Sequence, residues 1–144
     1  MGRVTRPARR RTDTPGRRLL LDTHALLWWL TGDPHLSAAA RRVIGQTSAM
    51  AFVSAASAWE IATKVRLGRL DDPQGVTDSL GAHIRAQGFR ELPITLEHGR
   101  RAGKLPGPHK DPFDRMLIAQ AQSEGLAIVS NDEAFDPYGV VRVW

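Results

Sequence analysis

The sequence contains no cysteine, so neither a disulfide framework nor a thiolate metal site is available to this chain. It also lacks any uninterrupted run approaching the ~20 apolar residues that a membrane-spanning helix needs. The apolar stretch at residues 19–30 is interrupted after three leucines by Asp22, Thr23 and His24, which argues against a secretory signal. These absences predict a soluble, cytoplasmic protein with no membrane partner.

The whole chain has a formal net charge of +5, but outside the first 18 residues there is no net positive charge. Residues 1–18 contain seven arginines and one aspartate, whereas residues 19–144 contain 13 Lys and Arg against 14 Asp and Glu. A segment this rich in arginine and this poor in apolar residues cannot bury enough surface to fold. We therefore predict that residues 1–18 are a disordered arginine-rich extension, either a tail that binds polyanions or an inert addition.

Residues 19–144 are predicted to form one domain, because a chain of this size with 42% hydrophobic residues can fill a single core. Short apolar runs predict strands at residues 19–21, 50–53, 89–94, 126–129 and 140–144. The segments between them have helical spacing, and Asp111 followed by Pro112 is a strong helix start. Strands that alternate with helices predict an α/β fold with a mainly parallel central sheet of about five strands, covered by helices on both faces.

Four acidic residues are predicted to meet at one edge of this sheet. Asp22 ends the first strand and Asp132 follows the fourth, while Glu60 and Asp114 lie near the starts of two helices. In open α/β sheets, ligands bind beyond the carboxyl ends of the strands. Clustered carboxylates repel one another unless a cation neutralises them, so the pattern predicts a site for Mg²⁺ or Mn²⁺.

Each acid also has a purely structural interpretation. Asp114 could complement the helix macrodipole, Glu60 could close a capping box with Ser57, and Asp132 could form an Asx turn. Asp22 favours a functional role, because a carboxylate placed directly after three buried leucines is desolvated. A metal site is excluded only if the structural interpretation is correct for all four acids at once. This joint requirement favours the metal site.

The segments that contain these acids resemble the PIN-domain ribonucleases, specifically the VapC-type toxins of type II toxin–antitoxin pairs. The matching segments are LLLDTHALLWWL at 19–30, VSAASAWEIATKVRLGRL at 53–70, DPFDRMLIAQAQ at 111–122 and IVSNDEAF at 128–135. The resemblance covers essentially all of residues 19–144 and implies a PIN-like α/β/α sandwich in that range. The arginine-rich residues 1–18 depart from it, since such proteins usually begin just before the first strand.

The resemblance implies a Mg²⁺- or Mn²⁺-dependent endoribonuclease that hydrolyses RNA and is kept inactive by a cognate antitoxin protein. The catalytic and metal-binding residues that it implies are Asp22, Glu60, Asp114 and Asp132. Ser130 and Asn131 resemble the polar residues that support the metal shell in this family. Arg115 is interpreted equally as orienting the scissile phosphate or as pairing with a neighbouring carboxylate. A homodimer that builds a shared groove is also predicted, because the domain itself is not basic.

Two other functions compete with this one. A phosphatase of the haloacid-dehalogenase type needs a second acid two positions after the first, where this chain has His24. A noncatalytic PIN-like module would bind RNA or a protein, but the filled acidic positions favour the enzyme. Trp28, Trp29 and Trp59 are predicted to be core or helix-packing residues, with an antitoxin or dimer surface as the alternative. His109 is a weak candidate for substrate contact.

Overall fold

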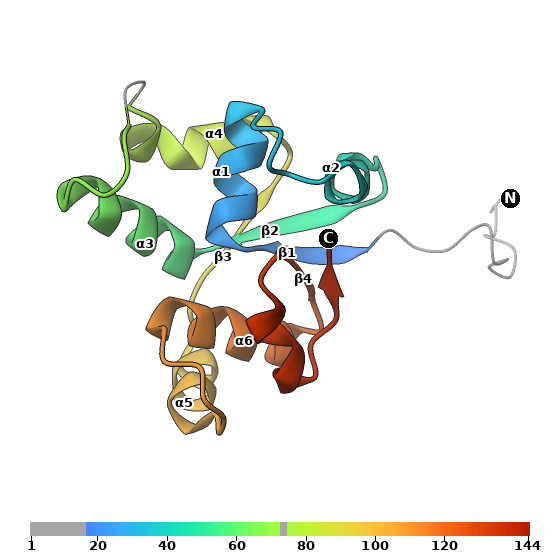
Figure 1. Ribbon diagram of the computed structural model, residues 1–144, viewed down its shortest axis with the longest axis vertical. Helices are drawn as coiled ribbons and strands as arrows, with labels where there is room; N and C mark the ends of the chain where they lie inside the picture. Colours follow the sequence, from blue (N-terminus) through green and yellow to red (C-terminus); the bar gives the residue numbers. More distant parts are fainter. Residues whose placement is uncertain (1–16, 73–74) are drawn as a thin grey trace, which may run out of the picture.

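Five parallel strands form the central sheet of the computed structural model, which describes residues 17–72 and 75–144. The strands are β1 (Arg18–Leu21), β2 (Met50–Ser54), β3 (Arg90–Leu92), β4 (Ala127–Val129) and β5 (Arg142–Val143), in the order β3-β2-β1-β4-β5 (Figure 1). The α-helices are α1 (Thr23–Thr31), α2 (Ala38–Gly45), α3 (Ala55–Arg66), α4 (Leu80–Ala86), α5 (Leu96–Lys104) and α6 (Pro112–Glu124). Two 3₁₀ helices, η2 (Val76–Ser79) and η3 (Glu133–Tyr138), complete the described elements. The predicted α/β class with a parallel sheet is confirmed.

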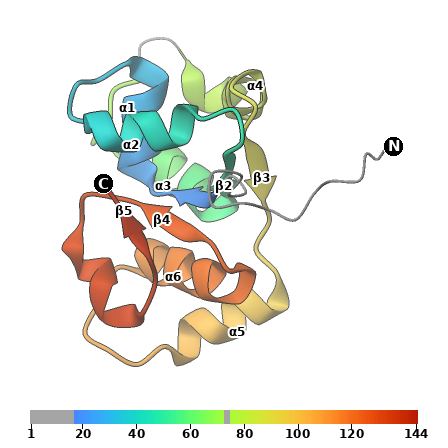
Figure 2. The same cartoon turned by 90° about the vertical axis from the view of Figure 1, so that its right-hand side faces the viewer.

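Helices cover both faces of the sheet, as the two orthogonal views show (Figures 1 and 2). Helices α1 to α4 lie on one face, and α5 and α6 lie on the other. Leu19 and Leu21 of β1 pack in the first core, whereas Leu20 packs against Leu117 and Ile118 in the second. Successive side chains of a strand point to opposite faces, so all three leucines are fully buried. The three-leucine run is therefore a strand buried on both faces, as predicted.

Arg18 belongs to β1, so this strand begins one residue before its predicted start at residue 19. It pairs in register with Met50 of β2, and its Nη1 donates a 2.7 Å hydrogen bond to the carbonyl oxygen of Glu124 at the end of α6. Its guanidinium also lies 5.7 Å from the centre of the Phe52 ring. A helix C-terminus attracts a cation, which explains an arginine here. Residues 1–16, the rest of the predicted extension, lie outside the described residues.

The start of α3 differs from the capping-box interpretation. Ser54 caps the helix, because its hydroxyl accepts a 2.9 Å hydrogen bond from the backbone N–H of Ala56. The helix therefore begins before Ser57, and the capping box of Ser57 with Glu60 is wrong. By contrast, Asp111 caps α6 with Pro112 in its first turn, as predicted. The carboxylate of Glu60 is consequently free to point elsewhere.

The chain leaves β1 and β4 toward opposite faces of the sheet. After β1 it enters α1 on one face, and after β4 it enters η3 on the other (Figures 1 and 2). β1 and β4 are neighbours in the sheet, so a crevice opens between the two departing chains, at the carboxyl ends of these strands. In the described part of the chain, no helix is both long and apolar enough to cross a membrane.

Candidate active site

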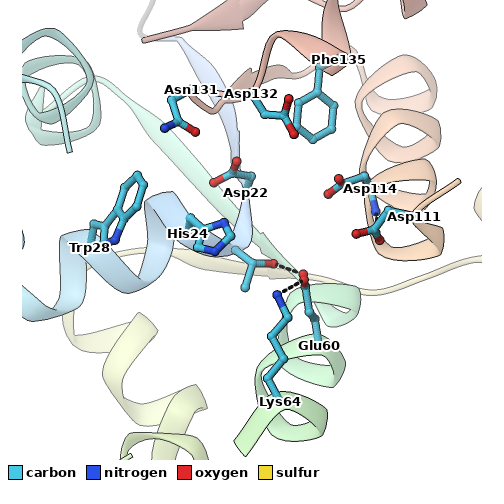
Figure 3. A pocket seen from close by; sticks show the side chains of 11 residues that line it. Asp22, His24, Trp28, Glu60, Lys64, Asp111, Asp114, Asn131, Asp132 and Phe135 are labelled. Carbon is cyan, nitrogen blue, oxygen red and sulfur yellow. Dashed lines mark hydrogen bonds and ion pairs between the residues drawn. The ribbon is translucent and has the colours of Figure 1, made fainter. Parts of the chain in front are cut away.

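An acidic cavity of about 500 Å³ opens at the carboxyl ends of β1 and β4 (Figure 3). The carboxylates that line it are Asp22, Glu60, Asp111, Asp114 and Asp132. The structure thus brings the four predicted acids to one cavity and adds Asp111, which the sequence suggested only as a helix cap. The spacing of three residues between Asp111 and Asp114 could have predicted this, because it places both side chains on one side of the first helical turn.

Asp22 occupies the first position after β1 and is almost fully buried. Its Oδ1 accepts a 2.7 Å hydrogen bond from the backbone N–H of Ala25, so it also caps α1. Burial raises the pKa of Asp22 above its usual value, although hydrogen bonds from Ser130 and from the Ala25 N–H oppose the rise. The cap was not predicted, and it explains how a carboxylate is tolerated directly after a buried strand.

Glu60 is buried with both carboxylate oxygens engaged (Figure 3). The Thr23 hydroxyl donates to Oε1 at 2.6 Å, and the Lys64 ammonium lies 2.8 Å from Oε2. Glu60 is therefore less available to a metal ion than an acid with a free oxygen. Sequence analysis missed Thr23, because its contact depends on how α1 packs against α3. Lys64 also lines the cavity.

Asp114 has the largest pKa shift of the cavity acids for which a shift is resolved. Its pKa is raised to about 7, first by burial and then by the negative charges of four neighbouring acids, in the order Asp111, Glu60, Asp22 and Asp132. Its ordinary value is 3.8, so near neutral pH this carboxyl retains a proton about half of the time. A divalent cation in the cavity would favour the ionised form and remove that proton.

Asp132 and Ser130 come from the segment that follows β4. The Asp132 Oδ1 accepts a 2.9 Å hydrogen bond from the Ala134 N–H, so the carboxylate caps η3 while it lines the cavity. The Asx-type interpretation of Asp132 is thus correct, and it does not remove the side chain from the site. The fully buried Ser130 accepts a 2.9 Å hydrogen bond from the Asp132 N–H, and its side chain is also close enough to Asp22 to lower the pKa of that carboxyl. Asn131 also lines the cavity.

Arg115 does not pair with a neighbouring carboxylate among the described residues, so that interpretation is wrong, and its orientation of a phosphate stays a prediction. Its guanidinium donates to the carbonyl oxygens of His109, at 2.8 Å, and Leu105. It is not among the residues that line the acidic cavity, and within residues 17–72 and 75–144 it forms no ion pair with a carboxylate. Its observed role is therefore to fasten the loop between α5 and α6 to the start of α6.

The residues of the cavity fit a divalent cation. One ligand atom each from His109, Asp114 and Asp132 lie within 4.8 Å of one another. At this spacing the three residues could hold one divalent ion between them. Asp22 and Glu60 lie outside this tightest group, whereas the sequence-based set included them and omitted His109.

Comparisons with known proteins agree with this fold. The family model of the PIN domain matches residues 19–140. The chain superposes on the crystal structure of VapBC2 from Rickettsia felis bound to a promoter DNA fragment with a TM-score of 0.65 at 13% identity, covering 87% of this chain and 96% of that chain. VapC20 from Mycobacterium tuberculosis, described as a sarcin–ricin loop cleaving toxin, gives 0.63 at 15%, covering 85% and 96%.

FitAcB from Neisseria gonorrhoeae is similar with a TM-score of 0.58 at 19% identity, covering 86% of this chain and 95% of that chain. No curated protein matches the chain. At these identities the structural comparisons establish the fold, and the family model confirms the resemblance to the PIN domain. Because the family model spans most of the chain, this protein belongs to the PIN-domain family.

Proposed function

We propose that the protein is a divalent-metal-dependent endoribonuclease and the toxin of a type II toxin–antitoxin pair. The observation that carries this proposal is the convergence of five carboxylates on one cavity at the carboxyl edge of a PIN-domain sheet. The description of VapC20 as a toxin that cleaves the sarcin–ricin loop supports RNA as the substrate class.

Asp22, Asp114 and Asp132 would bind Mg²⁺ or Mn²⁺ in this cavity. A bound ion lowers the pKa of a coordinated water and stabilises negative charge on the phosphate. Thr23 and Lys64 orient Glu60 at the cavity wall, where its carboxylate can accept a proton from an attacking water. Such hydrolysis leaves a 5′-phosphate and does not need the 2′-hydroxyl of the RNA.

A cognate antitoxin is the proposed protein partner, since VapBC2 and FitAcB are toxin–antitoxin complexes. The surface near the cavity supports this choice. Trp59 is 64% exposed, so it is not a core residue, but its ring packs edge-on against the Phe113 ring of α6 with 4.9 Å between centroids. Exposed aromatic side chains are enriched at protein interfaces. A homodimer that builds a shared groove is also proposed, because residues 19–144, with 13 Lys and Arg against 14 Asp and Glu, are not basic.

The direct test is cleavage of total cellular RNA by the purified full-length protein in Mg²⁺ or Mn²⁺. Asp22→Asn and EDTA should each abolish discrete fragments that end in 5′-phosphate. Asp136→Asn is the matched control, because Asp136 is an exposed acid that pairs with Arg142 and does not line the cavity. Cleavage that survives Asp22→Asn would show that the activity arises elsewhere, for example from a contaminant.

One observation favours a noncatalytic binding module as the second candidate. Asp22, Asp111 and Asp132 each cap a helix, so three of the five acids already have a structural role. If wild-type protein and Asp22→Asn are both folded and equally inactive on RNA with either metal, this candidate replaces the nuclease.

A further inference from the structure

The backbone of His109 is fixed on both sides in the loop between α5 and α6. Its N–H donates a 2.9 Å hydrogen bond to the Tyr138 hydroxyl, and its carbonyl oxygen accepts from Arg115. Its ring lies 6.2 Å from the Phe135 ring, measured between centroids, and Phe135 lines the acidic cavity. The imidazole is thus held beside the carboxylates before any ligand binds.

The Nε2 atom of His109 is buried and lacks a hydrogen bond of acceptable geometry within the described part of the chain. It lies 3.1 Å from Oδ2 of Asp114. Leaving a buried polar atom without a partner costs about 1–3 kcal/mol, so such atoms are rare and call for an explanation. Ligand atoms of His109, Asp114 and Asp132 lie within 4.8 Å of one another. A cation bound by all three residues would give the buried nitrogen its missing partner.

We propose that His109 is a direct ligand of the divalent ion, through Nε2, together with Asp114 and Asp132. This rests on the metal site of the proposed function but not on RNA cleavage. Mg²⁺ takes oxygen ligands almost exclusively, whereas imidazole suits first-row transition ions. The nitrogen ligand therefore makes the site prefer a transition ion such as Mn²⁺ to Mg²⁺.

Binding through Nε2 requires a neutral ring whose proton is on Nδ1. In the metal-free structure the backbone N–H of Asp111 donates a 3.4 Å hydrogen bond to Nδ1, which favours the opposite tautomer. This bond is longer than the usual range of about 2.7–3.2 Å, so it is weak and metal binding would have to replace it. The competing explanation is that Nε2–H only donates to Asp114, and it makes a different prediction for metal selectivity.

The experiment titrates full-length, metal-free protein with MnCl₂ and MgCl₂ by calorimetry, without RNA. His109→Leu should lower Mn²⁺ affinity about tenfold or more, because even the loss of a residue that only supports a metal ligand costs about tenfold. The same variant should change Mg²⁺ affinity much less. His24→Leu is the matched control, because His24 lines the same cavity but is outside the ligand group, and its Mn²⁺-to-Mg²⁺ affinity ratio should not change.

A second measurement does not depend on the folding of a variant. Pulsed electron paramagnetic resonance of Mn²⁺-loaded wild-type protein should detect nitrogen coupling that changes on ¹⁵N-histidine labelling and is lost in His109→Leu. Absence of this coupling, its loss in His24→Leu instead, or an equal fall of both affinities in His109→Leu would overturn the assignment. Nitrogen coupling in a protein that cuts no RNA would leave the ligand assignment intact and refute the nuclease alone.

Discussion

Replacing Asp114 by asparagine should stabilise the metal-free protein at alkaline pH. The folded state raises the pKa of Asp114 from 3.8 to about 7, so it retains a proton that the unfolded chain has released. Well below pH 3.8 both states are protonated and the carboxyl contributes no difference. As pH rises from about 4 to 7, its contribution to the free energy of unfolding falls, and above 7 the full destabilisation is present. Asparagine removes the charge and with it this penalty.

The expected size of the gain follows from the shift. One pKa unit corresponds to about 1.4 kcal/mol, so the change from 3.8 to about 7 sets an upper limit of about 4 kcal/mol. The Asp114 side chain is 21% exposed, and solvent screens the surrounding charges. We therefore expect Asp114→Asn to raise the free energy of unfolding by about 1–2 kcal/mol at pH 8 and by almost nothing at pH 4.

Urea denaturation in EDTA, at intervals from pH 4 to 8, measures the difference between wild-type protein and the variant. Asp136→Asn is the control, because Arg142 holds the pKa of that exposed carboxyl below its usual value and its removal should give no gain. Adding Mg²⁺ or Mn²⁺ should reverse the order, since binding stabilises the folded wild type and not the variant. A pH-independent difference, or a variant that is less stable at pH 8 without metal, would refute the electrostatic reasoning.

Three further predictions concern contacts that support the site. Ser54→Ala should destabilise the protein by about 1 kcal/mol in urea denaturation because it removes the cap of α3, and Ala55→Ser, at the exposed next position, should cost less. Thr23→Val should cost about 1–3 kcal/mol, since Glu60 Oε1 would lose its donor while buried; an unchanged midpoint would show that water replaces the hydroxyl. His98→Leu should lower stability by a similar amount, because the buried ring accepts from the Thr95 N–H and contacts Glu124 at 2.8 Å; thermal unfolding with Arg100→Leu as an exposed control checks it.

The elements that could be predicted from the sequence are those with local signals. Asp111, Pro112 and Gly125 mark the ends of α6, and the predicted helix agrees with the observed one. The β3 strand was predicted too long, at residues 89–94, and the observed strand ends at Leu92. It ends there because Pro93 has no N–H to donate to the neighbouring strand. The η3 helix was missed, since Pro137 lies inside it and suggests a loop.

The site was predictable only where topology alone determines position. The four predicted acids follow strands or begin helices at one edge, so a parallel sheet is enough to bring them together. The positions of Arg115 and His109 depend instead on the path of the loop after α5, in which Arg115 contacts carbonyl oxygens six and ten residues back in the chain. No periodicity in the sequence encodes that path, and His109 was therefore undervalued.

The central position of β1 also has a consequence for how the molecule is made. Leu19 pairs with Ala127, 108 residues later, and the cavity needs Asp22 from one end of this span and Asp132 from beyond the other. Parallel pairing across so long a span is a high-contact-order step and is slow. During synthesis, the first strand must wait for the fourth to leave the ribosome before the acids can meet. A chain that has not been translated beyond Asp132 cannot assemble the cavity, so any activity that depends on the cavity begins only after that point.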